Sequence, residues 1–202
     1  NITVPVQKLI ITLKDDDDNA AGLTIPSGGY TTPTEYPGMM LEWADEFNGT
    51  TLNTNWWSFE TGDGCPNNCG WGNNELQYYR EDNTTLVDGN LVITAKKQSF
   101  ANRDYTSSRL VTKGKKVFKY GRIDIRAALP KGKGIWPALW MLGSNIDVVG
   151  WPACGEIDIM ELTGDLPNRV LGTVHFGNNV ANHQYKGTSY YLPGNKNFQD
   201  EF

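Results

Sequence analysis

The segment Gly155–Glu161 constrains the fold most, because its acidic and apolar residues alternate. In a helix, two residues that are two positions apart lie on nearly opposite faces, so Glu156 and Asp158 would be separated. In a strand these two carboxylates share one face, while Ile157 and Ile159 share the other. The alternation therefore predicts a strand with one acidic face.

The third acid of this segment, Glu161, does not fit a regular strand. Strict alternation would place Met160 beside the acids and bury Glu161, where an unpaired carboxylate is costly. One extra residue, a β-bulge at Ile159–Met160, returns Glu161 to the acidic face, and bulges recur next to active sites. The sequence thus predicts three carboxylates along one side of one strand.

This spacing is typical of a pair of catalytic carboxylates. With the bulge, the Cα atoms of Glu156 and Glu161 are about four strand steps apart, roughly 13 Å. Side chains that lean together close this to roughly 5–6 Å, as in a retaining glycosidase. Crowding of like charges also raises at least one pKa, as a general acid requires. The alternative is a solvated acidic face or a calcium site. Aromatic neighbours in the sequence argue against it: Trp136, Trp140, Trp151 and His175.

Several residues around this segment are candidates for sugar binding. Trp136 and Trp140 would point the same way in a strand and stack on sugar rings, or both would be core tryptophans, and the two readings stay open. His175 either hydrogen-bonds a catalytic carboxylate or is a core histidine whose hydrogen bonds are satisfied. Considered without its neighbours, the second reading is favoured. Arg109 and Asn74, within Asn73–Glu75, are candidates for contacts with sugar hydroxyls, although each alone is typical of an ordinary surface residue.

Most other signals along the chain indicate β structure. Short β-branched or aromatic segments, separated by glycine-containing turns, predict strands at Asn90–Ala95, Lys116–Tyr120, Arg122–Ala127 and Val170–Phe176. No amphipathic helix of about ten residues or more is evident. We therefore expect an all-β sandwich or barrel, with a curved sheet if many aromatic residues line one face.

Composition excludes some classes of protein. A length of 202 residues fits one domain plus an appendage. A formal net charge of −5 disfavours a dedicated nucleic-acid binder. No apolar run approaches the ~20 residues of a membrane helix. Asn1–Pro5 lacks the basic and apolar regions of a signal peptide, so we expect that any such peptide has been removed.

The first 37 residues differ from the rest. Val4–Leu13 is compatible with one strand, and the acidic run Asp15–Asp18 precedes Ala20–Pro37, which is rich in Gly, Ser, Thr and Pro. This composition predicts a solvated linker, with calcium binding by the four aspartates as the alternative. The globular pattern begins near Met39, so we expect residues 1–37 to be a strand and linker and 38–202 to be the catalytic domain.

The chain has three cysteines. Cys65 and Cys69 bracket Pro-Asn-Asn, and a disulfide between them fits an exported protein. So short a loop constrains disulfide geometry tightly, so the pairing stays open. Cys154 stands alone. A zinc site is not expected, because neither of the two histidines pairs with a cysteine at metal-ligand spacing.

Taken together, these segments resemble a known family. Gly155–Glu161 resembles the signature of glycoside hydrolase family 16. Further segments look like its laminarinase branch, in matching order: Glu42–Gly49, Gly70–Tyr79, Leu91–Ala95, Tyr120–Arg126 and Gly134–Leu142. The resemblance covers about residues 39–202.

The resemblance implies a jelly-roll β-sandwich with a concave substrate cleft and endo-hydrolysis of β-1,3-glucan (laminarin) with retention of configuration. By position, Glu156 would be the nucleophile and Glu161 the general acid/base, while Asp158 would hydrogen-bond to the nucleophile and tune it. The residues that would line the cleft are Asn74, Arg109, Trp136, Trp140 and His175. The alternatives are a hydrolase of the same family acting on mixed-linkage glucan, agarose or carrageenan, and a non-catalytic β-glucan-binding module.

The resemblance implies no cofactor for catalysis. It allows a structural calcium held by backbone oxygens near Glu46 and Gly89, with a late Asp beyond residue 202. We expect a secreted or cell-surface protein whose partner is a β-glucan, with neither nucleic acid nor a membrane span. Asn197–Phe202 looks like the entry to another strand, so we expect the C-terminal strands to be a second chain or to lie outside this sequence.

Overall fold

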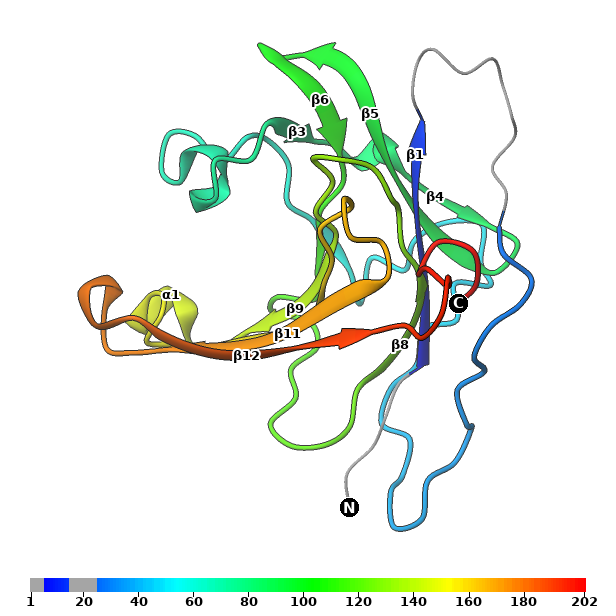
Figure 1. Ribbon diagram of the computed structural model, residues 1–202. Helices are drawn as coiled ribbons and strands as arrows, with labels where there is room; N and C mark the ends of the chain where they lie inside the picture. The colour runs from blue at the N-terminus through cyan, green and yellow to red at the C-terminus, as the bar shows by residue number, and fades with distance from the viewer. Residues whose placement is uncertain (1–5, 15–24) are drawn as a thin grey trace. The chain divides into compact units, whose positions relative to one another are not determined.

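The computed structural model describes residues 6–14 and 25–202, and for 6–14 only the path of the backbone (Figure 1). The chain divides into two compact units, residues 1–128 with Phe202 and residues 129–201. Both units are built from strands. In the described part, the α-helical residues are limited to α1 (Ile146–Val149), and the 3-10 helices η1 (Cys69–Gly72), η2 (Glu81–Asn83) and η3 (Val180–Asn182) are equally short. The all-β prediction is confirmed.

The first unit contains a six-stranded sheet in the order β3-β6-β5-β1-β8, with β4 also paired to β5. Its strands are β1 (Val6–Lys14), β3 (Gln77–Tyr79), β4 (Thr84–Val87), β5 (Asn90–Phe100), β6 (Arg103–Ser107) and β8 (Asp124–Ala128). A smaller pair joins β2 (Ser58–Phe59) to β7 (Leu110–Val111). Asp88 and Gly89 connect β4 to β5, and both have the positive φ that a two-residue hairpin turn requires.

The N-terminal strand expected from the sequence is present as β1. It runs parallel to both of its neighbours, β5 and β8, so it is an integral part of the sheet. Val92 of β5 and Ala128 of β8 are buried in the core of this unit, with Phe202 packed against them. The acidic run Asp15–Asp18 lies outside the described residues, as does the linker up to residue 24.

The second unit is a four-stranded antiparallel sheet in the order β12-β11-β10-β9. Its strands are β9 (Ala138–Leu142), β10 (Glu156–Glu161), β11 (Arg169–Phe176) and β12 (Gln184–Tyr191). Figure 1 shows α1 in the connection between β9 and β10, at one end of this sheet. The inner strand β10 carries the acidic segment.

The predicted bulge in β10 is confirmed. From Asp158 to Glu161, β10 advances three residues, while the paired positions on β9 advance two, from Trp140 to Ala138. The register against β11 shifts in the same interval. One residue of β10 is therefore extra, and Glu161 returns to the side of the sheet on which Asp158 lies.

Two expectations about strands were wrong, and a third was not tested. Lys116–Tyr120 is not a strand, because the Lys116 N–H turns back to the Thr112 carbonyl instead of joining a ladder. Trp136 precedes the strand that holds Trp140, since β9 begins only after Pro137. The segment that begins at Asn197 forms a turn, in which the Asn197 side chain accepts a hydrogen bond from the Gln199 N–H, and its role as the entry to another strand stays a prediction.

The structure also settles the state of the cysteines. Cys65 and Cys69 form the disulfide that the sequence left open, and Cys154 is a free thiol. No helix within residues 6–14 and 25–202 has the length and apolar character needed to cross a membrane.

Candidate active site

Glu156, Asp158 and Glu161 lie on one face of the β10 sheet, which we call the carboxylate face. Residues directly opposite each other on neighbouring strands share a face, and Asp158 is opposite Trp140 while Glu156 is opposite His175. The bulge adds Glu161 to the same face. A strand of six residues thus presents three acids to one side.

Asp158 is a buried carboxyl whose ionisation is perturbed by its surroundings. Its side chain is only 5% exposed, and its pKa is raised from 3.8 to about 7. Burial is the main cause, followed by the negative charges of Glu156 and Glu161 and a hydrogen bond with Glu156. Each of these favours the protonated carboxyl. Below about pH 7, Asp158 is therefore a neutral group that donates a hydrogen bond to Glu156.

The raised pKa of Asp158 predicts a pH-dependent stability. Its ionised form is about 4 kcal/mol less favourable in the folded protein than in the unfolded chain. Between pH 3.8 and 7 the folded state holds the extra proton, so the free energy of unfolding falls as the pH rises. Asp158→Asn removes the charge and keeps both hydrogen-bonding functions. We expect its stability advantage over the wild type to grow from pH 5 to 8, up to about 4 kcal/mol.

Urea unfolding at both pH values measures this effect. Asp165→Asn is the matched control, because it removes a carboxylate that is exposed in the same unit. An advantage of Asp158→Asn that is equal at pH 5 and pH 8 would contradict the perturbed carboxyl.

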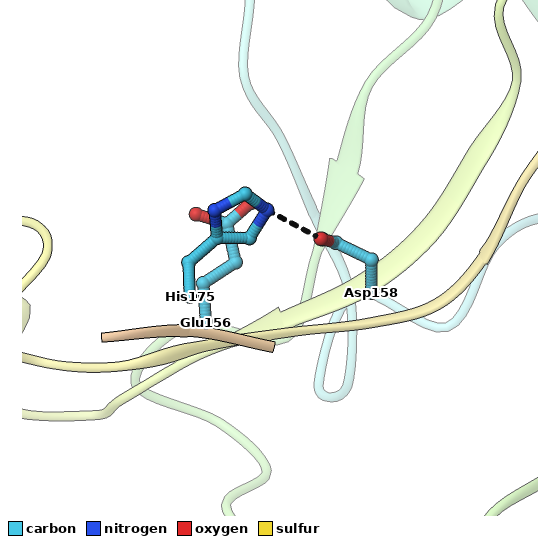
Figure 2. A group of neighbouring side chains, drawn as sticks. All are labelled: Glu156, Asp158 and His175. Atoms are coloured by element: carbon cyan, nitrogen blue, oxygen red, sulfur yellow. Dashed lines mark ion pairs between the residues drawn. The ribbon is translucent and has the colours of Figure 1, made fainter. Parts of the chain in front are cut away.

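His175 holds Asp158 from the neighbouring strand β11. Its Nε2 is 3.1 Å from Asp158 Oδ2. Figure 2 marks this contact with a dashed line, and Glu156 offers an oxygen within 4.8 Å of the same histidine. The structure thus places the half-buried His175 against a carboxylate of the site, which agrees with the first of the two readings and not with the favoured one, a satisfied core histidine.

Two tryptophans each donate an N–H to one glutamate. Trp136 Nε1 is 3.0 Å from Glu161 Oε1, and Trp151 Nε1 is 2.5 Å from Glu156 Oε2. Trp136 is 51% exposed, so it is not a core residue. Trp140 also lies on the carboxylate face, opposite Asp158. The surroundings of the acids are therefore aromatic rings with polar edges.

Two residues of this site were not among the predicted site residues. Trp151 follows α1, and its only sequence signal is that it lies close to the acidic segment. His183 lies between η3 and β12, and its Nε2 is 2.8 Å from Nδ1 of His175. It is the second of only two histidines in the chain, and this is the one sequence feature that marks it.

Two predicted binding residues, Asn74 and Arg109, belong to the first unit. Arg109 donates from Nε to Glu60 Oε2 at 2.5 Å, and its guanidinium lies 4.5 Å from the centre of the Trp71 ring. Asn74 is exposed and has a positive φ. Their part in substrate binding stays a prediction.

Two places in the structure bring together atoms that could bind a metal ion, one on the carboxylate face and one near Gly89. Glu156, Asp158 and His175 each offer a ligand atom, and these atoms lie within 4.8 Å of one another. Hydrogen bonds among them and from Trp151 already engage these side chains, so we interpret the group as a hydrogen-bonded network. In the first unit, a Cβ on Gly89 would lie 2.9 Å from the side-chain oxygen of Asn48 and 3.9 Å from the Glu46 carbonyl oxygen.

The sequence of this chain is similar to those of known proteins. The model of Glycosyl hydrolases family 16 matches residues 67–202. The chain is 45% identical over 185 residues to "Glucan endo-1,3-beta-glucosidase A1" of Niallia circulans, covering 85% of this chain and 27% of that protein. It is 44% identical over 146 residues to "Glucan endo-1,3-beta-glucosidase" of Cryptopygus antarcticus, covering 68% and 51%. The chain thus spans about half, or less, of the length of these relatives.

Solved structures show the same likeness. The catalytic domain of an endo-1,3-beta-glucanase (laminarinase) from Thermotoga petrophila RKU-1 is 48% identical, with a TM-score of 0.74 over 80% of this chain and 66% of that one. The laminarinase catalytic domain from Thermotoga maritima MSB8 is 43% identical, with a TM-score of 0.71 over the same shares. The expected jelly-roll class is confirmed by this likeness. With a family model that spans most of the chain, the protein belongs to glycosyl hydrolases family 16.

Proposed function

We propose that this protein hydrolyses internal linkages of β-1,3-glucan with retention of configuration. The observation that carries the proposal is the carboxylate face: Glu156 and Glu161 lie on one side of β10, with a buried, protonatable Asp158 between them. Two carboxyl groups are the machinery of a retaining glycosidase. The names of the relatives support the choice of β-1,3-glucan.

In this mechanism Glu156 is the nucleophile and Glu161 the general acid/base. Glu156 attacks the anomeric carbon and forms a covalent glycosyl-enzyme, while Glu161 gives its proton to the departing glycosidic oxygen. Glu161, now a carboxylate, then takes a proton from water, and that water cleaves the glycosyl-enzyme. Two inversions at the same carbon retain its configuration.

The neighbours of the two glutamates adjust them for these roles. Trp151 donates to one oxygen of Glu156, and Asp158 donates to Glu156 from within the strand, so the nucleophile is held in one orientation. Because Asp158 is neutral below about pH 7, it adds no third negative charge beside the attacking carboxylate. Trp136 orients Glu161 through its indole N–H.

We propose that substrate contacts come from the exposed ring of Trp136 and from Trp140 and His175 on the carboxylate face. For Asn74 and Arg109 of the first unit, we propose separately that each can bind a sugar hydroxyl. Arg109 is held in place by its ion pair with Glu60, which fixes the guanidinium that we propose as a donor to sugar hydroxyls.

The test is the release of reducing ends by the purified chain from laminarin, beside lichenan and agarose. Fast release from laminarin, with a β-anomer as the first product by NMR, supports the proposal. Faster release from lichenan would instead identify a mixed-linkage glucanase, and faster release from agarose a galactan hydrolase. Binding of laminarin without release would identify a glucan-binding module.

We further propose a structural calcium in the first unit, held by the backbone oxygens of Glu46 and Gly89. Support comes from the position of Gly89, which lies near two oxygens: a Cβ there would be 2.9 Å from the side-chain oxygen of Asn48 and 3.9 Å from the Glu46 carbonyl oxygen. Calcium binds several oxygen ligands of this kind. The ion would stabilise the β4–β5 turn, and it would take no part in the reaction.

Removal of this ion is expected to lower the melting temperature. A ligand at 100 times its Kd adds about 2.7 kcal/mol to stability, which corresponds to about 5–10 °C for a chain of this size. The measurement is a thermal scan in excess EGTA and after calcium is restored. Magnesium is the control and should not restore the loss. Equal melting temperatures with and without calcium would refute the site.

We also propose that the protein acts outside the cytoplasm, as a secreted or cell-surface enzyme. The disulfide between Cys65 and Cys69 supports this location, since such bonds persist in oxidising compartments. Polymeric β-glucan is also a substrate that a cell meets outside its membrane.

A further inference from the structure

His183 extends the hydrogen-bond network of the carboxylate face by one residue. Its Nε2 is 2.8 Å from Nδ1 of His175, and the two rings are nearly parallel, with centroids 5.1 Å apart. The other nitrogen of His175, Nε2, is 3.1 Å from Asp158 Oδ2. A continuous chain of polar contacts therefore runs from His183 through His175 to Asp158, which is hydrogen-bonded to Glu156.

The direction of hydrogen bonding along this chain depends on the tautomer of His175. A neutral imidazole has one N–H donor and one acceptor nitrogen, and the partner of one nitrogen sets the state of the other. If His183 donates to Nδ1, the proton of His175 must reside on Nε2, which faces Asp158. Asp158 Oδ2 then accepts, and the proton of the carboxyl is left on its other oxygen for Glu156.

We propose that His183 is a positioning residue: it donates to Nδ1 of His175, and so fixes the tautomer and the carboxyl rotation with which Asp158 presents its proton to Glu156. The inference rests on the proposed glycosidase function. His183 touches none of the reacting atoms, and it acts through His175.

The backbone around His183 is held independently of its side chain. The His183 N–H donates to the Val180 carbonyl at 3.2 Å, and the Asn179 side chain caps η3 by accepting from the Asn182 N–H at 3.0 Å. Gly177 approaches this loop so closely that a Cβ there would lie 2.4 Å from the Asn182 carbonyl oxygen. Replacing the His183 side chain should therefore leave the loop in place.

The His183 ring also has a fixed position. It packs on Trp151, with ring centroids 4.5 Å apart, and on Tyr185 at 6.1 Å. Trp151 itself donates to Glu156. His183 therefore contacts Trp151, which holds the nucleophile, and also His175, which holds Asp158. This arrangement restricts the rotation that would break the contact with His175.

The first test is the ¹⁵N NMR spectrum of the imidazole rings. The chain has only two histidines, so the spectrum contains two rings, and the His183→Ala variant leaves that of His175 alone. In the wild type we expect His175 to be protonated on Nε2, with Nδ1 as acceptor. In His183→Ala we expect the two tautomers of His175 to be mixed. An unchanged His175 tautomer would overturn the proposal, whether or not the chain hydrolyses glucan.

The second test separates kcat from KM on laminarin. We expect His183→Ala to lower kcat by about 10- to 100-fold, the scale of a small misplacement of catalytic groups, with KM within about twofold. His183→Gln should recover most of kcat, because its amide can donate to His175. Gln184→Ala is the matched control. Gln184 is adjacent to His183 in the sequence, but it is paired with Phe176 and so lies on the side of the sheet away from the carboxylate face. This variant should behave as the wild type.

The third test is a double-mutant cycle with Asp158→Asn, measured on an activated aryl β-glucoside. If His183 acts through Asp158, adding His183→Ala to Asp158→Asn should change kcat by less than about twofold. Full additivity of the two losses would overturn the proposal, as would a raised KM with unchanged kcat. A wild-type chain inactive on every glucan would refute the proposed function instead, and the NMR result would still decide the role of His183.

Discussion

Replacing Glu156 by glutamine is expected to abolish hydrolysis of β-1,3-glucan while leaving the fold and glucan binding intact. The amide cannot attack the anomeric carbon, but its carbonyl oxygen still accepts the N–H of Trp151, which donates at 2.5 Å in the wild type. Loss of a nucleophile from a cooperating catalytic group lowers kcat by a factor on the order of 10⁶. We expect no activity above background.

The measurement is release of reducing ends from laminarin by the purified variant, together with calorimetric titration of a laminari-oligosaccharide. Asp165→Asn is the matched control, because it makes the same change of charge at an exposed position of the same unit. Wild-type turnover in Glu156→Gln would remove Glu156 from the role of nucleophile. Loss of both activity and binding, with a lowered melting temperature, would assign Glu156 to stability.

Replacing Glu161 by alanine is expected to abolish activity on natural glucan and to spare the formation of the covalent intermediate from an activated aryl glycoside. Such a substrate has a leaving group that needs no protonation, so only the second step lacks its base. Added azide attacks the intermediate without a general base, and turnover should recover. The product should be the β-glycosyl azide, since azide attack inverts the α-linked intermediate.

The configuration of this azide distinguishes the two glutamates. An α-azide would identify Glu161 as the nucleophile and exchange the roles of Glu156 and Glu161. No rescue, combined with a destabilised fold, would remove Glu161 from the site. Trp136 provides an internal reference. In Glu161→Ala its indole N–H loses the acceptor on Glu161, so a change in Trp136 fluorescence reports that the Glu161 side chain contacted it in the wild type.

Much of the local structure of the site could be predicted from the sequence. The alternation in Gly155–Glu161 predicted a strand, and the cost of burying Glu161 predicted the bulge, because both arguments use only the period of a strand and the solvation of a carboxylate. Lys116–Tyr120 has the same β-branched and aromatic character and is not a strand. Strand formation there depends on a neighbour to pair with, which residue propensity does not supply.

The tryptophans show where local reasoning stopped. Period-2 geometry predicted that Trp136 and Trp140 would point the same way along one strand, but β9 begins only after Pro137, so Trp136 lies before the strand. The sequence left open whether they were core or surface residues. The exposure of Trp136 decides the question for that residue, and its hydrogen bond to Glu161 joins segments that are 25 residues apart in the chain.

The sequence by itself determined which acids share a face, because side-chain direction in a strand follows from the backbone of that strand alone. Only the tertiary structure decided the partner of each acid: Trp151 for Glu156, His175 and then His183 for Asp158, and Trp136 for Glu161. These partners come from other strands and loops, whose approach depends on sheet pairing and on the paths of connections. The pKa of Asp158 follows from the same source, because burial and the distance to neighbouring charges are properties of the folded chain.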